Sequence, residues 1–376
     1  MIGATPGSAG VQTYGRGLEG LVAGETAISA IDGVRGHLLV RGHPLEQLVQ
    51  RSFEEVSHLV LFGALPDADR LRRWSAELER FSEPPAPALA ALQRVPGTAH
   101  PLALYRTMLT VAACIAPSVE QESDPAWSRP ARILSWSASL AAAAIRHLAG
   151  QAPVPAASAP PGHAQRFLFQ TLGRLPSPEE ARAFEVSLVV QVEHGLHAAA
   201  LAALTVISTG ADLGSAVLAG MGALSGIRHG GANQLAFEML AHLPDVDSAR
   251  RFAREALARH QRIPGFGHRV YKCPDPRVAL LEPHAVALLR ARGLEQRHEV
   301  YRALRDEVER ALGPRGIFAN VDSITGLVYH PLGLPPSAFP IPFCLAIQTG
   351  WMAHCLEYLP HGAMIEPGAV YVGPVN

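Results

Sequence analysis

The spacing of apolar residues constrains the fold of this chain most strongly, because it repeats with a helical period in almost every patterned segment. Ser52-Phe53-Glu54-Glu55 is a capping-box signature, and the apolar residues after it fall largely on one face until Gly63. Ser177-Pro178-Glu179-Glu180 repeats this device and predicts a helix that runs toward Gly195 or beyond. No run of alternating β-branched residues of strand length occurs after residue 45. The sequence therefore predicts an all-α fold.

One short hairpin is the exception, and we expect it between Gly24 and Gly42, where Asp32-Gly33 interrupts the apolar residues. The chain has 376 residues, of which 48% are hydrophobic, so it can bury a sizeable core as one large domain or two. The apolar stretch Ala138 to Ala144 is too short to span a bilayer and is typical of a buried helix.

Charge and cysteine usage restrict the partners and the compartment. The formal charge is -1, with 32 basic and 33 acidic residues spread along the chain, which predicts no nucleic-acid or membrane partner. The four cysteines lack metal or disulfide spacing, and Met1 to Gly17 lacks the apolar core of a secretory signal. We therefore expect a cytoplasmic protein with free thiols whose partners are small molecules or a second copy.

Two segments each place one histidine among glycines, which hold the ring at a turn where a ligand can approach. They are Gly226 to Asn233, with His229, and Pro264 to Lys272, with His268. A third segment adds the carboxylate of Asp322 between helical patterns. Two imidazoles and one carboxylate could deprotonate a carbon acid and stabilise the resulting enolate. Structural turns carry the same residue types, and Asp322 could equally be a helix N-cap, so the residues alone leave both interpretations open.

Metal binding is a further alternative, suggested by the 17 histidines. His194 and His197 have i,i+3 spacing on a predicted helix and could chelate, but the sequence specifies no third ligand, so we predict no metal site.

These segments belong to a longer series of ordered motifs that resembles the citrate synthase family. The series contains GLEGLVAGETAIS (17–29), IDGVRG (31–36), EHGL (193–196), HGGAN (229–233), GFGHRVYK (265–272), DPR (275–277), NVD (320–322) and YVGP (371–374). The resemblance implies an all-α fold in which a smaller helical domain closes over the active site, and a homodimer. Carried over, the large domain takes 1–214 and 323–376, and the small domain takes 215–322.

The resemblance also implies roles for individual residues. His229 resembles the histidine that stabilises the enol of the acyl-CoA thioester, and Asp322 resembles the base that removes the α-proton. His268 resembles the residue that polarises the acceptor carbonyl, and His194 resembles another acceptor contact. Arg277 resembles a carboxylate-binding arginine, for which a guanidinium is suited by its two-pronged geometry. The structural alternatives are loop histidines, an interior histidine at 194 and a surface cation at the start of a helix.

For coenzyme A, the resemblance points to the backbone of Pro264, Gly265, Phe266 and Gly267, with Lys272 and, as a lesser candidate, Arg269. A glycine-rich turn beside cations suits phosphates. The resemblance implies no tightly bound cofactor, because acyl-CoA is a substrate.

Three departures from the family pattern alter the expected specificity. Ile347 occupies the position of one carboxylate-binding arginine, and Glu366 that of an arginine which in the family reaches the partner's acceptor. His197 replaces the family asparagine. An arginine lost opposite a buried carboxylate costs roughly several kcal/mol.

We therefore expect an acyltransferase that converts the acyl group to alkyl on transfer. It would condense acetyl- or propionyl-CoA with a 2-oxo acid other than oxaloacetate, in a Claisen/aldol reaction that releases CoA. A true citrate or 2-methylcitrate synthase and a CoA-thioester-binding pseudoenzyme are the alternatives.

Overall fold

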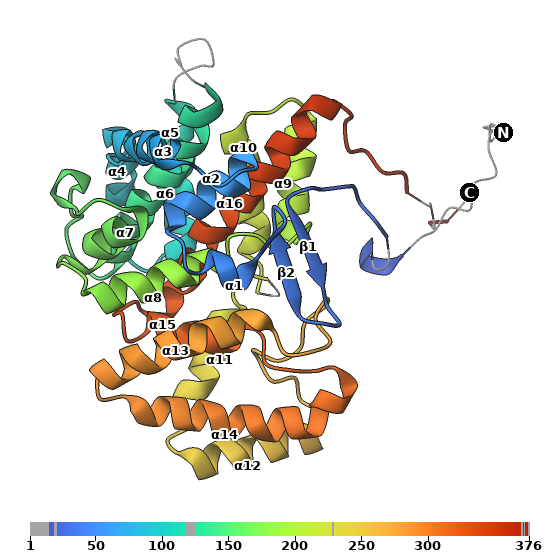
Figure 1. The fold of residues 1–376 in the computed structure, drawn as a ribbon. Coiled ribbons are helices and arrows are strands. Elements are labelled where there is room, and N and C mark those ends of the chain that lie inside the picture. Colours follow the sequence, from blue (N-terminus) through green and yellow to red (C-terminus); the bar gives the residue numbers. More distant parts are fainter. Residues whose placement is uncertain are drawn as a thin grey trace.

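The helices form a broad upper body and a lower layer in the view of Figure 1. The computed structural model describes residues 15–18, 21–116, 125–227, 229–369, 371 and 373–374. The upper body contains α1 (Leu45–Leu48), α2 (Phe53–Phe62), α3 (Ala68–Arg80), α4 (Ala86–Ala90), α5 (Pro101–Cys114), α6 (Pro125–Leu148), α7 (His163–Leu172), α8 (Pro178–Val189), α9 (Ala198–Ser208), α10 (Leu213–Leu224) and α16 (Pro340–Tyr358). The lower layer contains α11 (Ala232–Ala241), α12 (Val246–Ala258), α13 (Pro276–Ala291) and α14 (Glu295–Leu312), and α15 (Val321–Tyr329) packs between the two. Short 3-10 helices occupy Arg16–Leu18, Ala91–Arg94, Ala156–Ser158, Gly313–Arg315, Pro336–Ala338 and Leu359–His361.

The prediction of an all-α fold with one hairpin is confirmed. In the described part of the chain, the named strands belong to one antiparallel sheet of β1 (Ser29–Asp32), β2 (His37–Val40) and β3 (His43–Pro44). Ile31 pairs with Leu38, and Gly36 N–H donates to the Asp32 carbonyl at 2.9 Å to close the turn. Beyond β3, Phe266 and Ala319 form an isolated bridge.

The predicted helix starts are present, but one predicted end is wrong. Ser52 and Ser177 each form a complete capping box, and Gly63 ends α2 with a φ of 85°. The helix that begins after Ser177 does not reach Gly195, because it ends at Val189. Gly195 adopts a φ of 68°, and the buried carboxylate of Glu193 accepts its N–H, so a turn forms here instead of a helix.

Helix α16 is the centre of the upper body, and its residues from Pro340 to Cys355 are almost all buried. Gly350 lets it approach the segment after α8 closely, because a Cβ there would lie 2.1 Å from the Glu193 Oε2 atom. The apolar residues of α6 and α16 are covered by other helices of the same chain, so these two helices do not by themselves require a partner chain. None of the described helices is long and apolar enough to cross a membrane.

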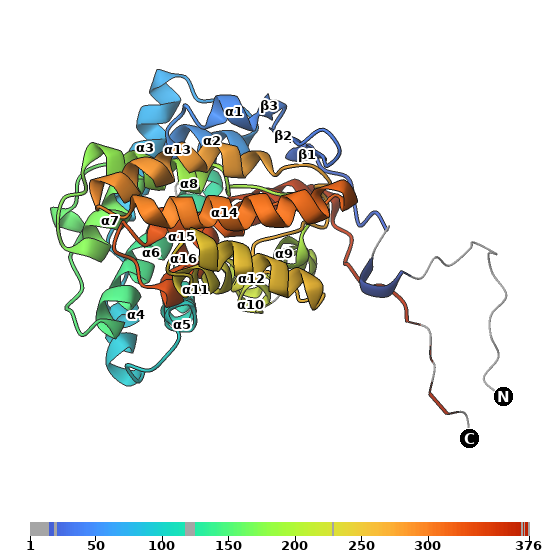
Figure 2. The ribbon, with the colours of Figure 1, turned by 90° about the horizontal axis from the view of Figure 1, so that it is seen from below.

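The lower layer carries the second histidine loop toward the hairpin. Viewed from below, α14 lies across the front beside α12, and α13 passes behind it (Figure 2). The loop that leads into α13 is held at the hairpin turn, since Lys272 N–H donates to the Gly33 carbonyl at 2.8 Å. A Cβ on Gly33 would lie 2.2 Å from the Val270 carbonyl oxygen, so the contact requires glycine.

Candidate functional site

Four histidines from three segments converge where the upper body meets the lower layer. His229 lies on the turn before α11, His194 and His197 lie between α8 and α9, and His268 lies on the loop before α13. His197 Nδ1 is 3.2 Å from His229 Nε2, and the rings of His194 and His268 lie 5.1 Å apart between centroids. The structure thus brings these four predicted histidines, which are spread over positions 194 to 268, into one cluster.

The metal alternative does not match this geometry. His194 and His197 lie outside the helices rather than on one helical face, and they contact different neighbours, Tyr271 and His229. Within the described ranges, no three histidine, cysteine or acidic side chains are grouped to hold a metal ion.

The segment from Pro264 to Gly267, called the strap below, bonds to the start of α15 and so places the adjoining His268 beside it. Gly265 adopts a φ of 83° and accepts a hydrogen bond from Asn320 N–H at 2.9 Å. Gly267 N–H donates to the Phe318 carbonyl at 2.8 Å, and the Asn320 side chain donates to the Gly267 carbonyl at 2.8 Å. Because a Cβ on Gly265 would lie 2.9 Å from Ser323, this close approach also needs glycine.

His268 is held as a neutral imidazole with its proton on Nε2. Its Nδ1 atom accepts hydrogen bonds from the Val270 and Tyr271 N–H groups, at 3.0 and 3.1 Å. An atom that accepts two N–H groups carries no proton, so the neutral ring has its hydrogen on Nε2. Burial, assisted by the positive charge of Arg277, lowers the pKa of His268 to about 4. His268 is therefore a neutral hydrogen-bond donor near pH 7.

The other three histidines are neutral for the same main reason. Burial lowers the pKa of His229, lowers that of His197 to about 3, and lowers that of His194 well below its usual value. A neutral imidazole can donate a hydrogen bond to an oxygen that gains negative charge during a reaction, and the imidazole itself need not carry a positive charge.

Asp322 follows the N-cap of α15 and does not cap the helix itself. Asn320 is the N-cap of α15, and its side chain accepts from Asp322 N–H at 3.0 Å, so the Asp322 carboxylate is not used for capping. Burial raises the pKa of Asp322 to about 6, and the nearby Arg277 partly opposes this effect. A carboxylate with this pKa is mostly ionised near pH 7 and is a stronger base than an ordinary aspartate.

Arg277 forms a buried ion pair that the sequence did not specify. The residue is only 4% exposed, which excludes a surface cation. Its Nε and Nη2 atoms donate to the two Asp275 oxygens at 2.9 and 2.7 Å. Asp275 also accepts Val321 N–H at 3.1 Å, and the Arg277 guanidinium lies 5.7 Å from the Tyr271 ring centroid. The pair therefore joins the start of α13 to the start of α15.

The residues predicted to bind coenzyme A differ in their exposure to solvent. Phe266 is buried, while Pro264 and Gly267 are half-buried in the strap. Arg269 and Lys272 are exposed, and they donate to the carbonyls of Gly17 and His268 at 3.4 and 3.2 Å.

Ile347 and Glu366, two of the departures from the family pattern, differ in burial. Ile347 is fully buried in α16, one turn before Trp351, and residues with this spacing share a helix face. Glu366 is exposed on the extended segment after α16, and the structure does not bring it to the cluster of its own chain.

Sequence reasoning missed four contributors. Tyr271 bonds His194 through its hydroxyl at 3.3 Å, and the Trp351 indole N–H donates to His197 Nε2 at 3.3 Å. The other two are Asp275 and Asn320, described above. Three of the four stand within the quoted motifs GFGHRVYK, DPR and NVD, so their place in a motif was the available signal. The signal for Trp351 was weaker, because it stands in the pair Gly350-Trp351 shortly after Ile347.

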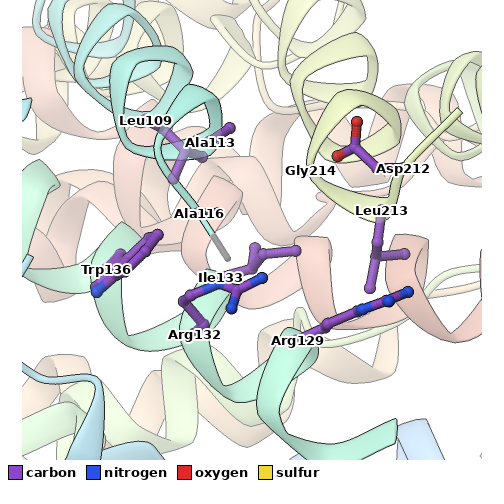
Figure 3. A pocket seen from close by; sticks show the side chains of 10 residues that line it. All are labelled: Leu109, Ala113, Ala116, Arg129, Arg132, Ile133, Trp136, Asp212, Leu213 and Gly214. Atoms are coloured by element: carbon purple, nitrogen blue, oxygen red, sulfur yellow. The ribbon is translucent and has the colours of Figure 1, made fainter. Parts of the chain in front are cut away.

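A separate pocket lies between α5, α6 and the start of α10 (Figure 3). Its walls are largely apolar and include Leu109 and Ile133, and Arg132 stacks over the Trp136 ring at 5.5 Å from its centroid. Its lining contains none of the residues of the histidine cluster, so we place the candidate site at the cluster.

Fold and site together define a class: an all-α protein whose turns hold neutral imidazoles and a basic carboxylate suited to proton transfer from carbon. The family model for the citrate synthase C-terminal domain matches residues 17–368. The chain therefore belongs to the citrate synthase family.

Similar proteins span nearly the whole chain. It is 32% identical to citrate synthase of Deinococcus radiodurans, over 95% of both chains. It is also 32% identical to 2-methylcitrate synthase of Mycobacterium tuberculosis, over 95% of this chain and 90% of that protein. Citrate synthase of Thermoplasma acidophilum, solved with carboxymethyl coenzyme A and oxaloacetate, has a TM-score of 0.89 at 28% identity, over 96% of both chains.

The raised pKa of Asp322 predicts that its ionisation destabilises the fold. Below about pH 3 the carboxyl group is protonated in the folded and unfolded chains, so it has no effect. As pH rises, the unfolded chain ionises first, and the folded state loses stability until the pH passes the folded pKa of about 6. Asp322→Asn should therefore raise the free energy of unfolding by about 1–3 kcal/mol at pH 7.5, with a much smaller gain at pH 4.

Urea unfolding of both proteins at the two pH values measures this difference. Asp212→Asn is the matched control, because hydrogen bonds within its helix cap lower the pKa of Asp212 despite partial burial, so it should show no gain. An Asp322→Asn protein without added stability at pH 7.5 would contradict the environment described for this carboxylate.

Proposed function

We propose that this chain condenses acetyl- or propionyl-CoA with a 2-oxo acid and releases CoA. The observation that carries this proposal is a carboxylate of pKa about 6 at the start of α15, which hydrogen bonds of Asn320 to Gly265 and Gly267 join to the loop of His268, together with neutral histidine donors. The solved relative with bound carboxymethyl coenzyme A and oxaloacetate supports the same class of substrates.

In the proposed reaction, Asp322 removes a proton from the carbon next to the thioester carbonyl. His229 donates a hydrogen bond to the thioester oxygen and stabilises the enol, since an α-proton this weakly acidic needs base and donor together. The enol carbon then attacks the acceptor carbonyl, which the Nε2–H of His268 polarises. The carbonyl oxygen takes up one proton, which balances the proton that Asp322 removed. Water finally hydrolyses the thioester and releases CoA. His194, hydrogen-bonded to Tyr271, is proposed to contact the acceptor.

For the CoA substrate, we propose the strap and the two exposed cations beside it. The strap exposes part of Pro264 and Gly267 to solvent, and Arg269 and Lys272 follow within the same loop. Their side chains can reach phosphate groups, whereas Gly265 and the buried Phe266 would contribute through the backbone.

The acceptor is proposed to carry a single carboxylate and to differ from oxaloacetate. Arg277 already neutralises Asp275, and Asp322 adds a second negative charge to its surroundings. Arg277 Nη1 is outside the pair with Asp275 and can still bind one carboxylate. Ile347 is apolar and buried, so it favours an apolar far end, whereas Glu366 would favour a donor or cation if it reached a partner's site.

Citrate or 2-methylcitrate synthesis is the second candidate, favoured by the names of the similar proteins. A pseudoenzyme that binds CoA thioesters without releasing thiol is the third. Turnover assays with oxaloacetate, and thiol release from acyl-CoA alone and with oxo acids, distinguish the three.

We propose that the chain works in the cytoplasm and has two domains, of which the smaller closes over the site. Helix α12 packs on α14, while α10 packs on α9 and α16, and these contacts support a start of the smaller domain near residue 225 rather than the expected 215. Free cysteines, two of them buried, agree with a reducing compartment.

We expect the roles of His229 and His268 to separate kinetically. Asp322→Asn and His229→Gln should each abolish exchange of acyl-CoA α-protons with D₂O, because the first removes the base and the second displaces the enol donor. His268→Gln should retain exchange and lose condensation, since it serves the acceptor carbonyl. NMR of the acyl group measures exchange, and thiol release measures condensation. Equal defects in both steps for both histidine variants would contradict these roles.

The acceptor preference should respond to charge. Ile347→Arg combined with Glu366→Arg should raise activity toward oxaloacetate at least about tenfold, if each charged contact contributes roughly 1.5–3 kcal/mol. Ile347→Met with Glu366→Gln is the control without added cations, and thermal unfolding checks that the buried arginine is tolerated. A natural chain that turns over oxaloacetate faster than every monocarboxylate oxo acid tested would overturn the proposed specificity.

A C2 homodimer is the proposed assembly, because both end segments expose large apolar side chains. Leu18 and Val22 are exposed near the N-terminus, and Met364 and Tyr371 are exposed after α16. Exposed apolar surface can mark an area that a partner covers, and a C2 dimer is the commonest symmetric assembly. Light scattering at micromolar concentration should give twice the 40.0 kDa chain mass, and a monomer would contradict the proposal.

A further inference from the structure

We propose that His197 and Trp351 form a relay that fixes the proton of His229 on Nδ1, so that His197 is a positioning residue. The relay is a property of the chain by itself, and its effect on catalysis rests on the proposed function of His229.

The direction of each hydrogen bond in the relay follows from Trp351, the residue at its end. The Trp351 indole nitrogen can only donate, and it lies 3.3 Å from His197 Nε2, so that nitrogen accepts and carries no proton. A neutral His197 must then carry its hydrogen on Nδ1, which lies 3.2 Å from His229 Nε2. His229 Nε2 accepts this hydrogen, which leaves the proton of the neutral His229 ring on Nδ1.

Rigid elements hold both ends of the relay. Trp351 is fully buried on α16, and its ring lies against Gly220 of α10, where a Cβ would be 2.6 Å from Trp351 Cε3. His197 is the N-cap residue of α9, yet its side chain makes no capping bond and is free to join the two neighbours. The turn that carries His229 is closed by hydrogen bonds from His229 N–H to the Gly226 carbonyl and from Gly230 N–H to the Leu224 carbonyl.

Reversing the His229 tautomer is unfavourable because it would also force His197 into its other tautomer. If His229 carried its proton on Nε2, His197 Nδ1 would have to accept it. The proton of His197 would then move to Nε2 and face the Trp351 N–H, leaving a buried donor without a partner. The relay thus keeps Nδ1–H of His229 as the available donor, whereas the backbone keeps Nε2–H on His268.

The tautomer can be observed in the absence of any substrate. In protein labelled with ¹⁵N-histidine, ¹H–¹⁵N correlation spectra at pH 7.5 should show His229 protonated on Nδ1 and bare on Nε2. A His229→Gln variant assigns the signals. Trp351→Phe keeps the ring but removes the donor, and it should give His229 a mixture of tautomers. Trp74→Phe removes another buried indole N–H, bonded to Ser57, and should leave the His229 signals unchanged.

Two nearly isosteric substitutions separate the donor from the volume it occupies. His197→Asn places an amide N–H where Nδ1–H was, and His197→Leu has similar size without a donor. The asparagine variant should retain His229 Nδ1–H and most of the α-proton exchange rate. The leucine variant should lose the fixed tautomer and slow exchange on the order of tenfold to hundredfold, as expected for a weakened oxyanion donor.

Each outcome decides a different claim. His229 protonated on Nε2 in the natural protein, or equal exchange rates for the asparagine and leucine variants, would overturn the relay. The predicted spectra together with no α-proton exchange in the natural protein would overturn the proposed function and leave the relay intact.

Discussion

The buried ion pair between Asp275 and Arg277 is the interaction on which the candidate site depends. Breaking such a pair by removing one partner typically costs roughly 3–5 kcal/mol, because the other charge is left buried. Here Asp275 also accepts Val321 N–H, so the pair fixes the start of α15, where Asp322 stands, against the start of α13. Burial lowers the pKa of His194, His197 and His268, the positive charge of Arg277 adds to this effect, and the same charge limits the rise that burial causes in the pKa of Asp322.

These neutral histidines and the basic carboxylate suit chemistry at a carbon next to a carbonyl, where charge develops only during the reaction. The same electrostatics limit what the site can bind. One buried arginine serves two carboxylates of its own chain, and the position of another arginine in the family is Ile347. This balance of charge is the reason for proposing an acceptor with a single carboxylate, while His229, His268 and Asp322 stand in motifs that resemble those of the family.

Local signals predicted much of this structure, and long-range packing accounts for what they missed. Caps and glycines gave the starts of α2 and α8 and the hairpin, and the motifs gave His229, His268 and Asp322. The turn that follows α8 contains Glu193, whose carboxylate bonds to Ser29 and His354 from distant segments. Trp351 meets His197 across 154 positions, a distance that no spacing rule covers. The domain boundaries stay a prediction.

The most direct test of this account is the pH dependence of α-proton exchange into acetyl-CoA, measured in D₂O without an acceptor. A base of pKa about 6 working beside histidines that stay neutral should give a rate that rises through about pH 6 and then remains constant to about pH 8. A rate that falls as pH rises from 6 to 8 would show that a protonated imidazole is required, and it would contradict the central claim.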